Sequence, residues 1–433
     1  MYVSGLFALL VAVGVVPVVL APAAGWDAAW AATAWAVLCI ALMIVDVAAA
    51  APLRPVVVER RIPTRARLGE PVEATVLLRN DGRRPLRGRL RDGWQPTAGA
   101  GDARIDVEVP AGERRAFVLR LLPRRRGELR TGFVALRSRG PMGLAGRQRV
   151  APAPGALRVL PPFASRRHLP SRLARLRELD GNTSVQVRGR GTEFDSLREY
   201  VRGDDVRSID WRATARAGTT MLRTWRPERD RHVVIVIDTG RTSATRVGDG
   251  VRLDAAMESA LLLSALAARA GDHVHLVMFD RARRARVTGV DGARLLPALV
   301  DAMAPVEPTL IDTDWSAVLT EVRSLTSRPS LVVLLTAQDS PEAARGFLGS
   351  LPSLTERTTV LVGAAMDAPD PAPGARTAED VYREAAIAHA DRDVERVAAA
   401  VRRAGGEALT ATPDALPPAV ADHYLALKAA GRL

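Results

Sequence analysis

The stretch His232-Val233-Val234-Ile235-Val236-Ile237-Asp238 decides how the C-terminal half of this chain folds. Its unbroken apolar run, with no polar alternation, is typical of a strand buried on both faces of a sheet. The run ends at an aspartate, which places a carboxylate at the carboxyl end of the strand. In open parallel sheets these ends form the crevice where ligands bind. The stretch therefore predicts both a fold class and a place to look for a site.

The same alternation of buried strand and amphipathic helix continues downstream to the C-terminus. Helix spacing is present in Leu253–Ala270, Trp315–Leu325 and Ala378–Arg403, and strand patterns in His273–Phe279, Ser330–Thr336, Thr358–Val362 and Glu407–Thr410, before a closing helix. Strands that alternate with helices indicate a mostly parallel sheet covered on both sides. We therefore predict an α/β doubly wound, Rossmann-like domain over residues 232–433.

Residues 54–160 have a different pattern, with short runs that alternate apolar and polar positions. Examples are Val72–Leu78 and Ala116–Leu121, and turn signals such as Asn80-Asp81-Gly82 and Gly140-Pro141 separate the runs. This pattern predicts an all-β sandwich of antiparallel strands.

The first 53 residues contain two long apolar stretches, Tyr2–Pro22 and Ala28–Ala51. Each is about 20 residues long, enough for a helix to cross a bilayer, and the second carries Asp46 near its far end, where a carboxylate can reach the interface. Basic residues follow the second stretch at Arg54, Arg60 and Arg61, whereas the turn between the stretches has none. The positive-inside rule then predicts a transmembrane helical hairpin over 1–53, in a multi-pass protein of the cytoplasmic membrane whose soluble domains face the cytoplasm.

Composition limits the possible partners of the soluble part. The 433 residues include 61 basic and 48 acidic ones, a formal net charge of +13, but every basic residue except Lys428 is arginine and only 4% of residues are aromatic. Arginines that are spread along the chain with few aromatics for base stacking do not indicate nucleic-acid binding, so no nucleic-acid partner is expected. With Cys39 as the single cysteine, neither an internal disulfide nor a cysteine-based zinc site can form.

Between the β and α/β patterns, residues 161–231 form a segment without a clean period. It includes GTEFDSLREYVRGDDVRSIDWRATAR at residues 191–216. This stretch resembles, without a gap, the signature of the domain-of-unknown-function 58 family, and the order of parts along the whole chain agrees with that family. The turn Gly140-Pro141-Met142-Gly143-Leu144 departs from it, because family members usually carry Asp and Phe where this chain has Gly140 and Met142. The resemblance implies a von Willebrand A-like domain and a membrane-anchored partner of a MoxR-type AAA+ ATPase in a chaperone-like assembly.

The signature supplies the first set of candidate site residues, which bind a partner or hold the structure together. They are Thr192, Glu193, Phe194, Asp195, Arg198, Glu199, Tyr200, Asp204, Asp205, Arg207, Asp210, Trp211 and Arg216. We expect a helix over Ser196–Val201. Two hypotheses remain for the role of the segment: it packs against the von Willebrand A-like sheet, or it contacts a separate protein.

The second set concerns a metal. Von Willebrand A domains often bind Mg²⁺ through a D-x-S-x-S loop, a threonine from a second loop and a later aspartate, because hard oxygen ligands suit this ion. Here Asp238, Thr242 and Thr313 fit that pattern, while Gly240 and Ala337 stand where two more ligands are expected. This degenerate set leaves two hypotheses, a weak Mg²⁺ site or a relic loop in which Asp238 caps the following segment.

These observations predict a membrane-anchored, non-enzymatic binding or scaffold protein. The alternative is a metal-dependent adhesion module that binds a peptide or a cell-envelope client. A remote alternative is a metal-dependent phosphoesterase in which Asp204, Asp205 and Asp210 hold two divalent ions. No G-x-x-x-x-G-K-[ST] motif occurs, so the chain offers no phosphate loop of its own.

Overall fold

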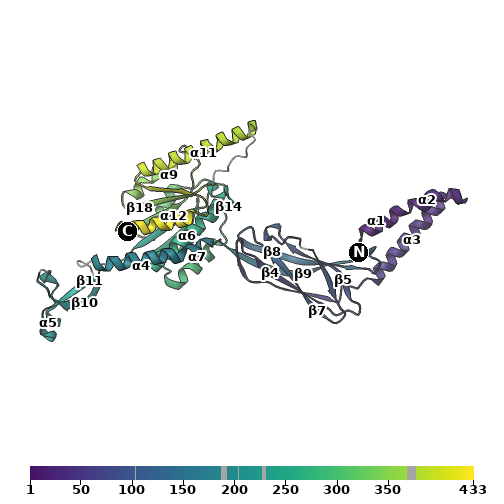
Figure 1. Cartoon of the computed structure of the whole chain (residues 1–433), viewed down its shortest axis with the longest axis horizontal. Helices are drawn as coiled ribbons and strands as arrows, with labels where there is room; N and C mark the ends of the chain where they lie inside the picture. The colour runs from purple at the N-terminus through teal and green to yellow at the C-terminus, as the bar shows by residue number, and fades with distance from the viewer. Residues whose placement is uncertain (103, 187–192, 203, 227–230, 368–376) are drawn as a thin grey trace. The chain divides into compact units, whose positions relative to one another are not determined.

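The computed structural model describes residues 1–102, 104–186, 193–202, 204–226, 231–367 and 377–433. It separates into two compact units, Met1–Leu160 and Pro161–Leu433 (Figure 1). The finer division into parts at 1–53, 54–160, 161–231 and 232–433 stays a prediction.

The first unit begins with the apolar segment. Its elements are β1 (Tyr2–Val3), α1 (Gly5–Val13), α2 (Val15–Leu20), the 3-10 turn η1 (Pro22–Ala24) and α3 (Ala28–Ala49). The 22-residue helix α3 is long and apolar enough to cross a membrane, whereas the apolar helical stretch Gly5–Leu20 is shorter. The Trp35 indole N–H on α3 donates a 3.2 Å hydrogen bond to the Leu10 carbonyl, so the two apolar segments pack together. One candidate span is thus described, and the two-span hairpin stays a prediction.

Hydrogen bonds to the Asp46 side chain link the end of α3 to a turn between β strands of the same unit. Its side chain is fully buried, and its carboxylate accepts hydrogen bonds from the backbone N–H groups of Met142, Leu144 and Ala145 at 2.8, 2.7 and 2.9 Å. The sequence suggested that this carboxylate can reach the membrane interface. Instead it satisfies three donors of a turn almost one hundred residues away, which the local pattern around Asp46 does not reveal.

Two sheets make up the rest of this unit. The strands are β2 (Val56–Arg61), β3 (Arg65–Arg67), β4 (Val72–Asn80), β5 (Leu86–Trp94), β6 (Arg104–Val109), β7 (Arg114–Leu121), β8 (Gly127–Arg139) and β9 (Ala145–Leu160), with a 3-10 turn η2 at Pro96–Ala98. One sheet has the order β1-β9-β8-β5-β6 with β3 beside β9, and the other has the order β2-β4-β7. Alternate residues of both sheets, such as Leu78 and Leu90, are fully buried in one shared cluster. The alternation that predicted β structure therefore reflects one buried face per strand.

The second unit contains a six-stranded sheet with the order β16-β15-β12-β17-β18-β19. Its strands are β12 (His232–Asp238), β15 (His273–Phe279), β16 (Arg283–Val287), β17 (Leu331–Leu335), β18 (Thr359–Ala365) and β19 (Glu407–Ala411). All neighbours are parallel except β16, which pairs antiparallel with β15. The strands predicted from the continuous apolar runs coincide with these to within three residues at each end.

Helices cover this sheet (Figure 1). They are α6 (Arg252–Arg269), α7 (Leu295–Met303), α8 (Trp315–Leu325), α9 (Arg345–Ser350), α10 (Pro352–Thr355), α11 (Ala378–Arg403) and α12 (Leu416–Ala429). Side chains of α8 to α11 share one buried cluster with β12, β15, β17 and β18. The short elements are η3 (Ala164–His168), η5 (Arg241–Ala244), β13 (Arg246–Val247), β14 (Gly250–Val251) and η6 (Gly292–Arg294).

The segment before the sheet differs from the sequence prediction. It contains α4 (Leu169–Gln186), which the charge-rich pattern did not reveal, and then β10 (Glu193–Glu199), η4 (Val206–Ser208), α5 (Trp211–Ala217) and β11 (Met221–Arg226). The helix expected over Ser196–Val201 is wrong, because β10 pairs antiparallel with β11. Cross-strand pairing determines the secondary structure of this segment, and the local spacing of residues does not reveal that pairing.

Candidate functional site

The carboxyl ends of β12 and β17 meet at Asp238. β12 lies between β15 and β17, so the order of the strands along the chain reverses at this point of the sheet. Asp238 is 2% exposed, and two hydroxyl groups donate to its carboxylate: Thr313 Oγ1 to Oδ1 at 2.5 Å and Thr336 Oγ1 to Oδ2 at 2.7 Å. These residues come from three separate segments, so the position is a convergence point of the fold.

Two further groups donate hydrogen bonds to the Asp238 carboxylate. The Gly240 backbone N–H donates to Oδ1 at 2.8 Å, and Thr242 Oγ1 lies 3.4 Å from Oδ2. Burial raises the pKa of Asp238, and the four hydrogen bonds oppose that rise without cancelling it. The sequence-predicted set Asp238, Thr242 and Thr313 is thus brought together.

A second buried carboxylate, Asp280, follows the neighbouring strand β15. It accepts hydrogen bonds from Thr239 Oγ1 at 3.0 Å, Thr309 Oγ1 at 2.8 Å and Arg284 Nε at 2.7 Å. Burial alone would raise its pKa, but these bonds and those from the backbone N–H groups of Arg281 and Ala282 hold the pKa well below the usual range. The two aspartates therefore have pKa values shifted in opposite directions.

Charged side chains surround the two buried carboxylates. Arg241 pairs with Asp312 at 3.2 Å and with Asp339 at 3.6 Å, and Arg252 pairs with Asp339 at 3.0 Å. Asp339 was the carboxylate nearest to the position where a metal ligand was expected. Its ion pairs direct it to these arginines, so it belongs to the charged surface around the crevice.

The Mg²⁺ hypothesis can be tested on the geometry of Asp238. A Cβ at Gly240 would lie 2.4 Å from Thr313 Oγ1 and 2.8 Å from the Ile311 carbonyl oxygen, so no serine side chain fits there without rearrangement. Both Asp238 oxygens already accept hydrogen bonds, and Ala337 has no side-chain oxygen to offer. The donor set fits a hydrogen-bonded carboxylate and does not fit a resident Mg²⁺ ion.

The signature residues form a small hairpin built on β10 and β11. Arg198 donates two hydrogen bonds of 2.7 Å to the two oxygens of Asp204. Asp205 caps η4 by accepting from the Arg207 N–H, and Asp210 caps α5 by accepting from the N–H groups of Arg212 and Ala213. Every one of the three aspartates therefore has a structural task inside this hairpin.

The remaining signature residues have varied positions. Glu199 and Tyr200 lie at the end of β10, where the Tyr200 N–H donates to the Thr220 carbonyl, and Arg207 and Arg216 are exposed. Trp211 begins α5 and is 71% exposed. Glu193 and Phe194 are placed by their pairing with Arg226 and Trp225, and Asp195 lies at the register shift between Phe194 and Ser196. Thr192 lies outside the described residues.

Asp210 also binds across the hairpin. Arg223 Nε on β11 donates to Asp210 Oδ2 at 2.7 Å, and the pKa of Asp210 is lowered by the backbone N–H of Ala213 and by Arg223. Two divalent ions on Asp204, Asp205 and Asp210 would have to displace these caps and ion pairs. This arrangement therefore does not support the phosphoesterase hypothesis.

Sequence reasoning missed several residues of the carboxyl edge as partners of the aspartates. The sequence predicted Thr336 as the end of a strand but not as a partner of Asp238, and it did not connect Thr239 and Thr309 with Asp280. A usable signal existed for Thr336, because it directly follows the apolar run of β17 just as Asp238 ends that of β12. No such signal marks Thr309, which lies in a loop without periodicity.

Comparisons with known proteins add the following. No match was found among curated proteins. The VWA domain of SpRpn10 matches 45% of this chain and 94% of its own length at 9% identity, with a TM-score of 0.28. The CARDB domain of the PF1109 protein from Pyrococcus furiosus, solved in complex with di-metal ions, matches 26% of this chain and 94% of its own length at 13% identity, with a TM-score of 0.18. A β-glucosidase from Listeria innocua matches 24% of this chain and 16% of its own length at 14% identity, also with a TM-score of 0.18.

With TM-scores this low, none of these structural likenesses carries the argument about the site. The sequence comparison is more direct, because it covers both the hairpin and the sheet. Residues 196–407, from within β10 to the first residue of β19, match the family described as Protein of unknown function DUF58.

Proposed function

We propose that this chain is a membrane-anchored, non-enzymatic binding protein whose carboxyl edge of the α/β sheet receives a partner protein. The observation that carries this proposal is the state of Asp238 and Asp280. Both carboxylates are buried and accept hydrogen bonds from groups of the protein itself. Their hydrogen bonds therefore order the surrounding loops and leave the carboxylates less available to a substrate. Such preorganised loops with charged surroundings suit recognition of a protein surface.

The proposed docking surface consists of the exposed arginines around the crevice, Arg241 and Arg281, together with Asp312, which contacts both. Exposed charges of this kind mainly set the association rate and the choice of partner. Apart from this surface, the hairpin presents exposed apolar side chains at Val206 and Trp211, which are 62% and 71% exposed. Aromatic and arginine side chains are the residues that most often dominate the energy of protein interfaces.

The first candidate partner is a MoxR-type AAA+ ATPase, which the resemblance to the domain-of-unknown-function 58 family implies. Partner capture from native membranes tests this. A tagged full-length chain is solubilised in mild detergent and recovered with and without ATP and Mg²⁺. We expect an AAA+ subunit in stoichiometric amount from the unaltered chain, and at least a tenfold lower yield from the Arg241→Glu/Arg281→Glu variant.

The matched control is Arg357→Glu, which makes the same change of charge at an exposed residue before β18, at the opposite end of the strands. It should recover the subunit as the unaltered chain does. Absence of any AAA+ subunit from the unaltered chain under ATP and Mg²⁺ would remove this partner from the proposal.

We also propose that the membrane segment is a two-span hairpin with both of its ends in the cytoplasm. Arg54, Arg60 and Arg61 follow α3, and the Gly25-Trp26-Asp27 turn lacks a basic residue. Cys39 is the single cysteine, so a Cys39→Ala chain gives a clean background for placing one cysteine at a time. In intact cells an impermeant maleimide should label a cysteine at Asp27 and should leave one at Arg345 unlabelled; the reverse pattern would invert the topology.

A further inference from the structure

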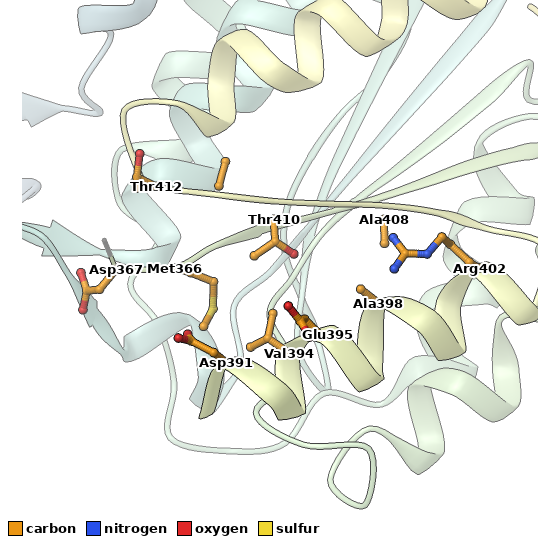
Figure 2. Close-up of a pocket in the computed structure, with 11 residues that line it drawn as sticks. Met366, Asp367, Asp391, Val394, Glu395, Ala398, Arg402, Ala408, Thr410 and Thr412 are labelled. Carbon is orange, nitrogen blue, oxygen red and sulfur yellow. The ribbon is translucent and has the colours of Figure 1, made fainter. Parts of the chain in front are cut away.

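A groove lies between helix α11 and strand β19, and none of its lining residues contacts Asp238. It encloses a cavity of about 480 Å³ (Figure 2). Figure 2 shows Val394 and Ala398 on α11 facing Ala408 and Thr410 on β19. Small side chains on both sides leave this volume open, whereas Val401 of the same helix is packed in the core.

Carboxylates line one end of this groove. Asp391 and Glu395 are four residues apart on α11, so they share one helix face as like charges, and both are exposed. Within the described part of the chain, neither has an ion-pair or hydrogen-bond partner. Arg402 lines the other end, seven residues beyond Glu395 or roughly 10 Å along the helix axis.

Strand β19 is the edge of the sheet. It is hydrogen-bonded to β18, and no strand of the described chain lies on its other side. Half of the peptide groups of such an edge strand face outward and can pair with an added strand. Proteins that recognise extended peptides use this pairing for affinity and neighbouring pockets for side-chain selection.

We propose that the groove binds an extended segment of a partner protein, which adds to β19 as a further strand and places a lysine or arginine between Asp391 and Glu395. Charge complementarity favours this occupant, because the two carboxylates that line the cavity have no partner within the described residues. The small side chains beside them leave space for the long aliphatic part of a lysine or arginine side chain. Arg402 at the far end favours an acidic residue or a terminal carboxylate there. This inference rests on the proposed binding function and adds a second binding site to it. It does not depend on which protein binds at the edge of the sheet around Asp238.

The probe is a fluorescein-labelled synthetic peptide, Thr-Val-Arg-Val-Arg-Val-Thr, titrated by anisotropy against the full-length chain in detergent. Two comparison peptides replace both arginines by glutamate, or replace the central valine by proline to remove a strand donor. We expect the basic peptide to bind at least tenfold more tightly than either. Amide hydrogen exchange of residues 407–411 should slow when it is bound, because their outward N–H groups gain partners.

Three variants locate the site. Asp391→Asn and Glu395→Gln should each weaken the basic peptide about threefold, the range of an exposed ion pair. Ala398→Leu should weaken it at least tenfold by filling the groove without changing the charge. Glu379→Gln, in the first turn of the same helix with its side chain 83% exposed, is the matched control and should bind normally. A melting temperature within about 2 °C of the unaltered chain confirms that each variant is folded.

Equal binding of the acidic or the proline peptide would overturn the proposal, as would no binding of the basic peptide at millimolar concentration. The partner capture described above is scored separately. Peptide binding without AAA+ recovery would contradict the ATPase proposal alone, and AAA+ recovery without peptide binding would contradict the groove alone.

Discussion

At the residue scale, the two buried aspartates should make stability depend on pH in opposite ways. The pKa of Asp238 is raised in the folded state, so its favourable contribution is present below the ordinary carboxyl range and is lost as pH rises through the raised pKa. The pKa of Asp280 is lowered, so its contribution is present above the ordinary range and is lost as pH falls toward the lowered pKa.

Replacing each aspartate by its neutral isostere should therefore separate the two effects. Asp280→Asn should cost on the order of 2 kcal/mol near pH 7, because Arg284 and two threonines lose a charged acceptor. The cost should be only slightly smaller near pH 3, because that pH still lies above the lowered pKa of Asp280. Asp238→Asn should show its largest cost near pH 3 and a decreasing cost as pH rises. Calorimetry of the three chains at pH 3.5, 5 and 7.5 measures this; parallel pH profiles for the two variants would contradict it.

Metal binding at Asp238 gives a second prediction at this scale. Because Thr313, Thr336 and the Gly240 N–H already satisfy the carboxylate, 10 mM MgCl₂ should change the melting temperature no more than NaCl of equal ionic strength does. A saturable rise with MgCl₂ that disappears in Thr313→Val would show that a cation replaces these hydrogen bonds.

At the scale of elements, the sequence predicted best where burial alone determines the structure. β12, β15, β17 and β18 are apolar on both faces, and that pattern has no competing interpretation over so few residues. It failed at β10, where local spacing suggested a helix over Ser196–Val201 but cross-strand pairing with β11 determines the structure. The convergence of Thr313 and Thr336 on Asp238 could be predicted only in part, because it depends on strand order.

The hairpin of β10, η4, α5 and β11 should lose its order locally when its internal charge pairs are removed. Arg198→Ala or Asp204→Ala breaks a bidentate pair that joins β10 to the loop before η4. Hydrogen exchange of residues 197–223 should become faster, while exchange within β12 and β17 stays unchanged. Arg202→Ala, an exposed neighbour, is the control. Loss of protection in β12 as well would favour the hypothesis that this segment packs against the sheet.

At the scale of the whole first unit, the buried Asp46 side chain is one of the groups that join the apolar helix α3 to the β strands, beside Arg84 and Arg147. A Cβ at Gly140 would lie 2.2 Å from Asp46 Oδ1, so the Asp46 carboxylate fills the space that a side chain at position 140 would need. The domain-of-unknown-function 58 family, which the sequence resembles, usually carries aspartate at that position. The departure at Gly140 and the acid inside an apolar helix therefore have one explanation: Asp46 supplies from α3 the acceptor that the turn 140–145 lacks.

Exchanging the two residues tests this coupling. Asp46→Gly should destabilise the first unit by on the order of 3 kcal/mol, because three backbone N–H groups, buried or partly buried, lose their carboxylate acceptor. Gly140→Asp alone should also destabilise it, through steric overlap and repulsion between two carboxylates. Gly140 is not among the glycines with positive φ, so the double variant can accept an aspartate there and should recover at least half of the lost stability. Thermal unfolding of the four chains in detergent measures the cycle, and strictly additive losses would show that Asp46 and position 140 serve the turn independently.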